Sequence, residues 1–70
     1  MPLVIAPIGK NLKIIRLLAD DKLKKHLESI GICANNSIKI LSQSGGNLIC
    51  IVKDCRLALD RNIATKILVA

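Results

Sequence analysis

Three cysteines and one histidine are the side chains of this sequence best suited to bind a metal ion: His26, Cys33, Cys50 and Cys55. Thiolate and imidazole groups are ligands that zinc and related transition metals prefer. Cys50 and Cys55 have four residues between them and lie in a strand context, which is a weak match to a zinc knuckle. We therefore expect no resident cofactor, with a site for Fe²⁺ or Zn²⁺ as the alternative.

The surroundings of these residues favour structural roles. Cys50 alternates with Leu48 and Val52, which is the pattern of a small apolar residue buried in a strand. His26 lies beside the apolar stripe of a predicted helix, where one ring nitrogen would remain in water. No carboxylate or nucleophile stands at a recognisable spacing from this histidine, so we expect no catalytic residue and no enzymatic activity. The odd number of cysteines favours free thiols in a reducing compartment.

The charged residues point instead to a binding surface. The chain has 11 Lys and Arg against 5 Asp and Glu, a net charge of +6, which favours an anionic partner. Basic residues cluster on a predicted helix and near the first predicted strand: Lys22, Lys24 and Lys25, and Lys10, Lys13 and Arg16. One interpretation is a solvated face that keeps a hydrophobic protein in solution. The other is a docking patch for an acidic protein surface.

Nucleic acid is the less suitable anionic partner. The chain has no Phe, Trp or Tyr, so it lacks the stacking platforms of single-strand binders and the aromatic groove that holds a proline-rich peptide. It has no helix-turn-helix, zinc-finger or RNA-binding signature. Gly45-Gly46 precedes no Lys-Ser or Lys-Thr pair and opens no helix, so it is not a phosphate-binding loop. We expect neither nucleic-acid nor nucleotide binding.

The elements that position these residues are predicted from hydrophobic periodicity. Branched apolar residues predict a strand over Leu12–Leu18. A helix follows, capped by Asp20 or Asp21 and running to Ile30, and Gly31 ends it. Further strands and turns are predicted at Ser37–Leu41, Leu48–Lys53, Arg56–Asp60 and Ala64–Val69, and at Asn35-Asn36, Ser42–Asn47 and Asp60–Asn62.

Short connections between these strands predict an antiparallel meander, because parallel pairing needs longer crossovers. Curling into a barrel hides the edges of so small a sheet, and the helix stripe Leu23, Leu27 and Ile30 would close one open end. The fold class is thus mainly β: a small antiparallel barrel of about five strands with one α-helix inserted after the first strand. Residues 1–70 form a single domain, and its thin core makes a homo-oligomer an expected aid to stability.

The N-terminal segment does not resemble a signal peptide, because Pro2 and Pro7 interrupt it and no basic start precedes it. The longest uncharged stretch runs from Ile40 to Val52 and is broken by polar residues. It is shorter than the roughly 20 apolar residues that a membrane span requires. We therefore expect a cytoplasmic protein that does not span the membrane.

Three groups of residues occur in an order that is typical of one family: Pro7-Ile8-Gly9 before the first strand, Leu23–Leu27 with Ile30–Ile32 on the helix, and Arg56–Leu59 before Ala64 and Ile67–Val69. In this order and over the whole chain they resemble the FeoA domain. That family consists of small cytosolic SH3-like barrels that accompany the bacterial ferrous-iron transporter FeoB. Two positions depart from its pattern, because Asn35-Asn36 replaces a usual glycine and Asp60 replaces a common basic residue. Asparagine also tolerates a positive φ, so we expect the turn to form.

The resemblance implies a regulator of ferrous-iron uptake that docks on the cytoplasmic part of FeoB and regulates its GTPase-coupled transport or assembly. The residues that would supply steering and hydrogen bonds to an acidic partner surface are Lys22, Lys25, Arg16 and Arg56. Those that would hold this surface in shape are Leu27, Gly31, Leu57 and Leu59. Two alternatives stay open: a transition-metal sensor built on His26 and the cysteines, and a basic nucleic-acid-binding barrel.

Overall fold

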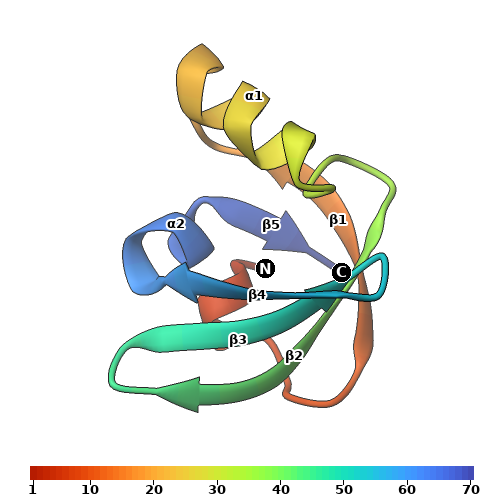
Figure 1. The fold of residues 1–70 in the computed structure, drawn as a ribbon, viewed down its shortest axis with the longest axis vertical. Helices are drawn as coiled ribbons and strands as arrows, with labels where there is room; N and C mark the ends of the chain where they lie inside the picture. The colour runs from red at the N-terminus through yellow and green to blue at the C-terminus, as the bar shows by residue number, and fades with distance from the viewer.

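Five antiparallel strands form one curled sheet, and a helix lies over one of its ends (Figure 1). The computed structural model describes residues 1–70. The elements are a short 3-10 helix η1 (Leu3–Ile5), β1 (Asn11–Leu17), α1 (Asp21–Ser29), β2 (Ser37–Ser44), β3 (Asn47–Val52), β4 (Cys55–Asp60), α2 (Arg61–Thr65) and β5 (Ile67–Val69). The strand order is β4-β3-β2-β1-β5. The expected mainly β, antiparallel, five-stranded fold with a helix after the first strand is confirmed.

Helix α1 begins and ends as the sequence predicts. The Asp20 side chain accepts a hydrogen bond from the Leu23 amide at 2.8 Å and so caps the N-terminus. At the other end Gly31 takes a φ of +98°. The amides of Gly31 and Ile32 donate back to the carbonyls of Glu28 and Leu27, at 3.1 and 2.9 Å. This pair of bonds is the Schellman arrangement, which turns the chain sharply off the helix axis.

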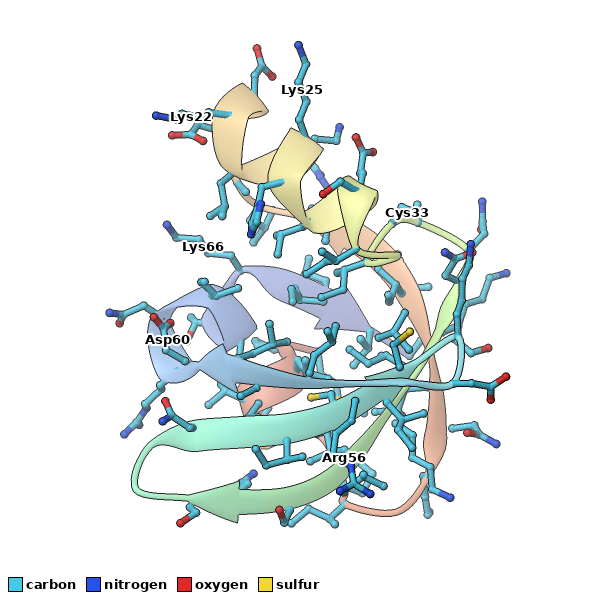
Figure 2. The ribbon with its side chains drawn as sticks, viewed as in Figure 1. Lys22, Lys25, Cys33, Arg56, Asp60 and Lys66 are labelled. Atoms are coloured by element: carbon cyan, nitrogen blue, oxygen red, sulfur yellow. The ribbon has the colours of Figure 1, made fainter.

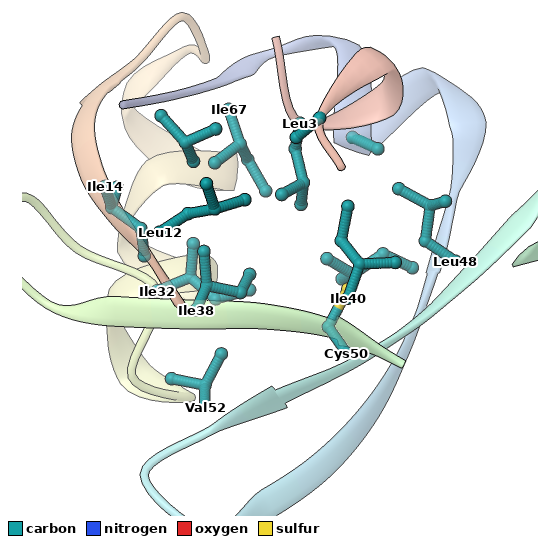
Figure 3. Packing of buried hydrophobic residues seen from close by; sticks show 14 of the residues in the cluster. Leu3, Leu12, Ile14, Ile32, Ile38, Ile40, Leu48, Cys50, Val52 and Ile67 are labelled. Atoms are coloured by element: carbon teal, nitrogen blue, oxygen red, sulfur yellow. The ribbon is translucent and has the colours of Figure 1, made fainter. Parts of the chain in front are cut away.

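The core fills the concave side of the sheet (Figure 3). All sixteen buried residues are apolar, and no buried side-chain polar atom lacks a hydrogen bond. Alternate residues of β3 are buried, Leu48, Cys50 and Val52, which confirms the structural role expected for Cys50. Leu27 of α1 is only 1% exposed, and Leu23 and Ile30 pack against the core from its rim. The apolar stripe therefore fixes α1 over the end of the sheet.

A bulge in β1 interrupts the expected alternation. Leu12 and Ile14 point into the core, but the register with β5 shifts between Ile14 and Arg16. Ile15 and Arg16 are then both exposed, and Leu17 is the next buried residue. An extra residue of this kind bends a strand and changes which side chains face outward. The bulge places Arg16 on the surface close to where β1 leads into α1.

The C-terminal third differs from the sequence prediction in one element. Asp60–Asn62 was expected to form a turn and Ala64–Val69 a strand, but Arg61–Thr65 forms the short helix α2 and only Ile67–Val69 is a strand. Asp60 caps α2, since its side chain accepts a hydrogen bond from the Ile63 amide at 2.8 Å. Five residues are too few to show a helical period, so the apolar residues of this segment read as a strand.

Both hairpins have two-residue turns, and the first is tighter than the sequence predicts. Strand β2 continues to Ser44 and β3 begins at Asn47, so only Gly45 and Gly46 form the turn, both with positive φ. Strands β3 and β4 are likewise joined by two residues, Lys53 and Asp54. Two-residue turns of this kind match the twist of the paired strands. Neither α1 nor α2 is long and apolar enough to cross a membrane.

Candidate functional site

Helix α1 carries three exposed lysines, Lys22, Lys24 and Lys25, and we call them the α1 surface. They lie around the solvent-facing part of the helix, which also carries the exposed Asp21 and Glu28. Figure 2 shows Lys22 and Lys25 extending from the end of the molecule where α1 lies. Because the Asp20 cap and the Schellman turn fix both ends of the helix, the positive charges sit on a rigid support.

Arg16 belongs to the same end of the molecule. It pairs across β1 and β5 with Leu68, after the bulge, and three residues separate β1 from α1. Two exposed apolar side chains lie near it in the sequence, Ile15 and Leu18, which are 50% and 49% exposed. An arginine between exposed apolar residues is a common composition for a protein-binding surface. Arg16 therefore extends the α1 surface toward the sheet.

Arg56 lies elsewhere, so the structure does not bring the four expected docking residues together. Figure 2 shows Arg56 on β4, far from Lys22 and Lys25 on α1. Across the sheet it pairs with Ile51 of β3, which pairs in turn with Lys39 of β2. Lys39 also lines a shallow hollow of about 130 Å³ together with Lys53. We call Lys39, Lys53 and Arg56 the sheet cluster.

Sequence reasoning missed two members of the sheet cluster. Lys53 stands three positions before Arg56 in the chain, but Lys39 is 14 positions from Lys53 and only the register of β2, β3 and β4 relates it to Arg56. Cross-strand neighbours on one face of a sheet interact in the way that residues four apart do on a helix. The alternation within Ser37–Leu41 was the one available signal, because it places Lys39 on the face opposite Ile38 and Ile40.

The residues expected to hold the surface in shape lie in and around the core. Leu27 and Leu59 are buried, and Leu57 is half-buried and packs against the core. Gly31 has a tight environment, because a Cβ atom there would lie 3.1 Å from Cγ1 of Val52. Its positive φ and this close approach both require a residue without a side chain.

The potential metal ligands do not converge. No group of three or more His, Cys, Asp or Glu side chains is arranged to hold a metal ion. Cys50 is fully buried, and burial raises the pKa of its thiol from 9.0 to about 11. Cys33 is half-buried and its sulfur accepts a hydrogen bond from Asn36 Nδ2 at 3.0 Å. Cys55 is exposed at the start of β4, and His26 is exposed on α1.

Two of the five carboxylates stabilise helix N-termini. Asp20 and Asp60 cap the two helices through their side chains. This gives a reason for Asp60, which departs from the pattern expected at its position. Asn35 adopts a φ of +74° and Asn36 Nδ2 donates to the Gly31 carbonyl at 2.9 Å. The expectation that this asparagine pair forms the turn is confirmed.

A curled antiparallel sheet of five short strands with a helix over one end and basic surfaces outside defines a small SH3-like protein. The sequence model of the FeoA domain matches residues 1–70, so the chain belongs to the FeoA domain family. That family consists of small accessory domains, is associated with ferrous iron transport and is not a known enzyme family.

Solved structures share this fold at low sequence identity. A crystal structure of the iron uptake regulatory protein FeoA is 21% identical with a TM-score of 0.89, over 99% of this chain and 93% of that one. Iron(II) transport protein A from Clostridium thermocellum is 24% identical with a TM-score of 0.91, over 99% of this chain and 44% of that one. FeoA from Stenotrophomonas maltophilia complexed with zinc, described as an SH3 domain protein, is 19% identical with a TM-score of 0.80, over 100% of this chain and 89% of that one. No curated protein sequence is similar enough to this chain to count as a match.

Proposed function

We propose that this chain is a non-enzymatic accessory protein of bacterial ferrous iron uptake. It acts in the cytoplasm by docking on the cytoplasmic part of a FeoB-type transporter, and it regulates transport or assembly there. Its membership of the FeoA family supports this function, together with the names of solved relatives as an iron uptake regulatory protein and an iron(II) transport protein.

The observation that carries the proposal is the α1 surface. Three exposed lysines lie on a nine-residue helix that Leu27 anchors to the core. Fixed positive charges raise the rate of encounter with an acidic surface and select against wrong partners. Arg16 adds a planar guanidinium, which binds carboxylates through two parallel hydrogen bonds. The partner face that fits this surface is acidic.

The apolar residues beside Arg16 supply the second component of docking. Ile15 and Leu18 are each about half exposed, and burying them against a partner removes apolar area from water. Charges alone change mainly the association rate, whereas burial of apolar anchors slows dissociation. Because this chain carries both the basic and the apolar residues at the end where α1 lies, we propose that this end binds the transporter. Arg56 belongs to a separate surface.

The test is a binding measurement between the purified chain and the soluble cytoplasmic domain of its cognate FeoB. The double variant Lys22→Glu/Lys25→Glu reverses two charges of the α1 surface without touching the core. We expect its affinity to fall by roughly tenfold or more, as expected for loss of charge pairs at a docking site. Raising the salt concentration should weaken the unmodified complex for the same reason.

The matched control is Lys10→Glu/Arg61→Glu, which makes the same change in net charge at exposed positions outside α1. Its affinity should stay within about twofold of the unmodified chain, since distant surface charges contribute little. Thermal unfolding of both variants should confirm that they fold. Equal losses in the two double variants would show that net charge alone drives the association, and an unchanged affinity of the α1 variant would exclude the proposed surface.

A further inference from the structure

The two edges of the sheet differ in how far their backbone groups are paired. At the β5 edge the N-terminal residues complete the hydrogen bonding, because the Met1 amino group donates to the Val69 carbonyl at 2.8 Å and the Val69 amide donates to Met1 at 2.7 Å. Pro2 also forms a bridge with Leu68. At the other edge β4 pairs only with β3, and no other strand follows it. One sheet edge is therefore covered and the other is open.

The register of the β3–β4 hairpin identifies the open groups. Val52 and Cys55 flank a two-residue turn and pair directly, and each further pair follows without a bulge down to Asn47 and Asp60. In an antiparallel ladder, alternate residues direct their N–H and C=O groups toward the partner strand, and the residues between them direct theirs outward. Counting from the turn, Arg56 and Ala58 direct theirs outward. An unpaired row of this kind is a template for another strand.

The two faces beside this edge differ in character. On the outer face Arg56 is exposed, and Lys39 follows it in the same cross-strand row beyond the half-buried Ile51. On the inner face a groove of about 410 Å³ runs between the end of α1 and β4, with Ile30, Val52 and Leu57 among its lining residues. Two acidic groups lie close by, Glu28 in the groove and Asp54 in the turn.

These neighbours specify the pattern of a strand that would fit. Side chains of an added strand alternate between the two faces. Those on the outer face would lie next to Arg56 and the sheet cluster, where carboxylates are favoured. Those on the inner face would lie next to Leu57 and the groove, where Glu28 and Lys53 carry opposite charges and the apolar lining favours apolar groups. The fitting segment is extended and alternates acidic with apolar residues.

The β3–β4 turn beside this edge contains Lys53 in a backbone conformation that costs energy for a residue other than glycine or asparagine. Lys53 and Asp54 adopt φ values of +50° and +66°, a region in which Asn-Gly is the preferred pair for such turns.

A second copy of this chain fits the β4 edge less well than an acidic strand does. Every copy carries a charge of +6, and pairing two β4 edges would bring arginines close together. Charge on the edge thus discourages self-association and favours an acidic strand.

We propose that the β4 edge is a second binding surface, which accepts an extended segment of alternating acidic and apolar residues as an added β-strand. Recognition combines main-chain hydrogen bonds to Arg56 and Ala58 with the sheet cluster on one face and the groove on the other. This surface is distinct from the α1 surface and goes beyond transporter docking through α1. It uses only the C-terminal end of α1 and leaves Lys22, Lys24 and Lys25 free, so the chain can bridge two partners or two parts of one partner.

The variant that tests strand addition is Ala58→Pro. Proline removes the outward N–H of residue 58 and is tolerated on an edge strand when that N–H faces solvent. Ala58→Ser is its control, because it keeps the backbone donor and a small side chain. The probe is a synthetic fluorescent peptide of alternating glutamate and valine, about seven residues long to match a strand of this length. A peptide of the same composition with its glutamates and valines in separate blocks tests the alternation.

We expect the alternating peptide to bind, with amide shifts centred on Arg56–Ala58 and on the groove residues Ile30 and Leu57. Ala58→Pro should weaken binding by roughly tenfold or more, the loss expected for removing a backbone hydrogen bond and blocking the edge. Ala58→Ser and the double variant Lys22→Glu/Lys25→Glu should bind as the unmodified chain does. The blocked peptide should bind more weakly, and thermal unfolding of Ala58→Pro confirms that it folds.

Four results would each overturn the proposal. One is the absence of binding up to about 1 mM peptide, which corresponds to only about 4 kcal/mol of binding free energy. Another is binding that Ala58→Pro leaves unchanged. A third is a shift pattern centred on the α1 lysines, which would assign the peptide to the α1 surface. The last is a concentration-dependent dimer that Ala58→Pro abolishes, which would assign the edge to a second copy of the chain.

Discussion

Cys50 shows at the scale of one residue how the fold removes a reactive group from chemistry. Its thiol is fully buried in β3, and burial raises its pKa to about 11 because the thiolate would lose its hydration. A thiolate is the form that binds metals and reacts with electrophiles. At neutral pH this residue therefore acts as a small apolar side chain, whereas Cys55 is exposed.

The raised pKa of Cys50 predicts a loss of stability in alkali. In the unfolded chain the thiol ionises near its ordinary pKa of 9.0, while in the folded chain it stays protonated up to about 11. Between these values the folded state holds one more proton, so the free energy of unfolding falls as the pH rises. Urea unfolding from pH 7 to pH 10.5 or so, under reducing conditions, measures this slope.

The control for this prediction is the difference between two alanine variants. Cys50→Ala should be about 1 kcal/mol less stable at neutral pH because of the cavity, but it should lose less stability than the unmodified chain as the pH rises. Cys55→Ala should follow the unmodified chain at every pH. A slope that Cys50→Ala leaves unchanged would show that another group causes the alkaline loss.

The structural role of a residue can be predicted from the sequence when a few neighbouring positions decide it. Asp20 as an N-cap, Gly31 as a helix stop and Cys50 as a core residue follow from a few neighbouring positions, and the structure confirms each. Asp60 follows the same capping rule with Ile63, but its helix is too short to show a period. A capping residue alone is therefore not enough to predict a helix of only five residues.

At the scale of elements, the junction between α1 and the β3–β4 hairpin depends on Gly31. An alanine there would have to adopt a φ of +98° and would place its Cβ 3.1 Å from Val52 Cγ1. We expect Gly31→Ala to lower the free energy of unfolding by about 2 kcal/mol, with roughly half from the backbone. Denaturant unfolding at neutral pH measures the loss.

Gly45→Ala is the matched comparison for the Gly31 prediction. Gly45 also has a positive φ, +56°, but nothing lies within 4 Å of an added Cβ. It should report the backbone cost alone, about 1 kcal/mol. If Gly31→Ala were no more destabilising than Gly45→Ala, the close packing of α1 on the hairpin would contribute nothing, and the groove beside β4 would lack a fixed wall.

Most of the elements were predictable from local sequence patterns. The seven residues of β1 and the nine of α1 are long enough to show a period, and both lie within about a residue of the predicted bounds. The bulge at Ile15 could not be predicted from the sequence, because it depends on pairing with β5, which is distant along the chain. The same dependence on distant pairing explains why the end of β2 was predicted at Leu41 and lies at Ser44.

At the scale of the whole molecule, two surfaces on different elements hold seven of the eleven basic residues, when Arg16 is counted with α1. Composition reveals the charge and helical spacing reveals the α1 surface. Lys53 and Arg56 are close in the chain, but three strands must be placed in register before Lys39 joins them in the sheet cluster. Sequence reasoning therefore grouped Arg56 with α1, and the structure instead places it at the β4 edge.

The measurement that tests the central claim most directly is an NMR titration of the labelled chain with the soluble cytoplasmic domain of its cognate FeoB. The account predicts amide shifts concentrated on Lys22–Lys25 and on the end of β1 around Arg16, and their loss in the double variant Lys22→Glu/Lys25→Glu. Shifts confined to β4 would support the second surface but contradict docking through α1. The absence of any shift at saturating concentrations of the transporter domain would contradict the proposed function itself.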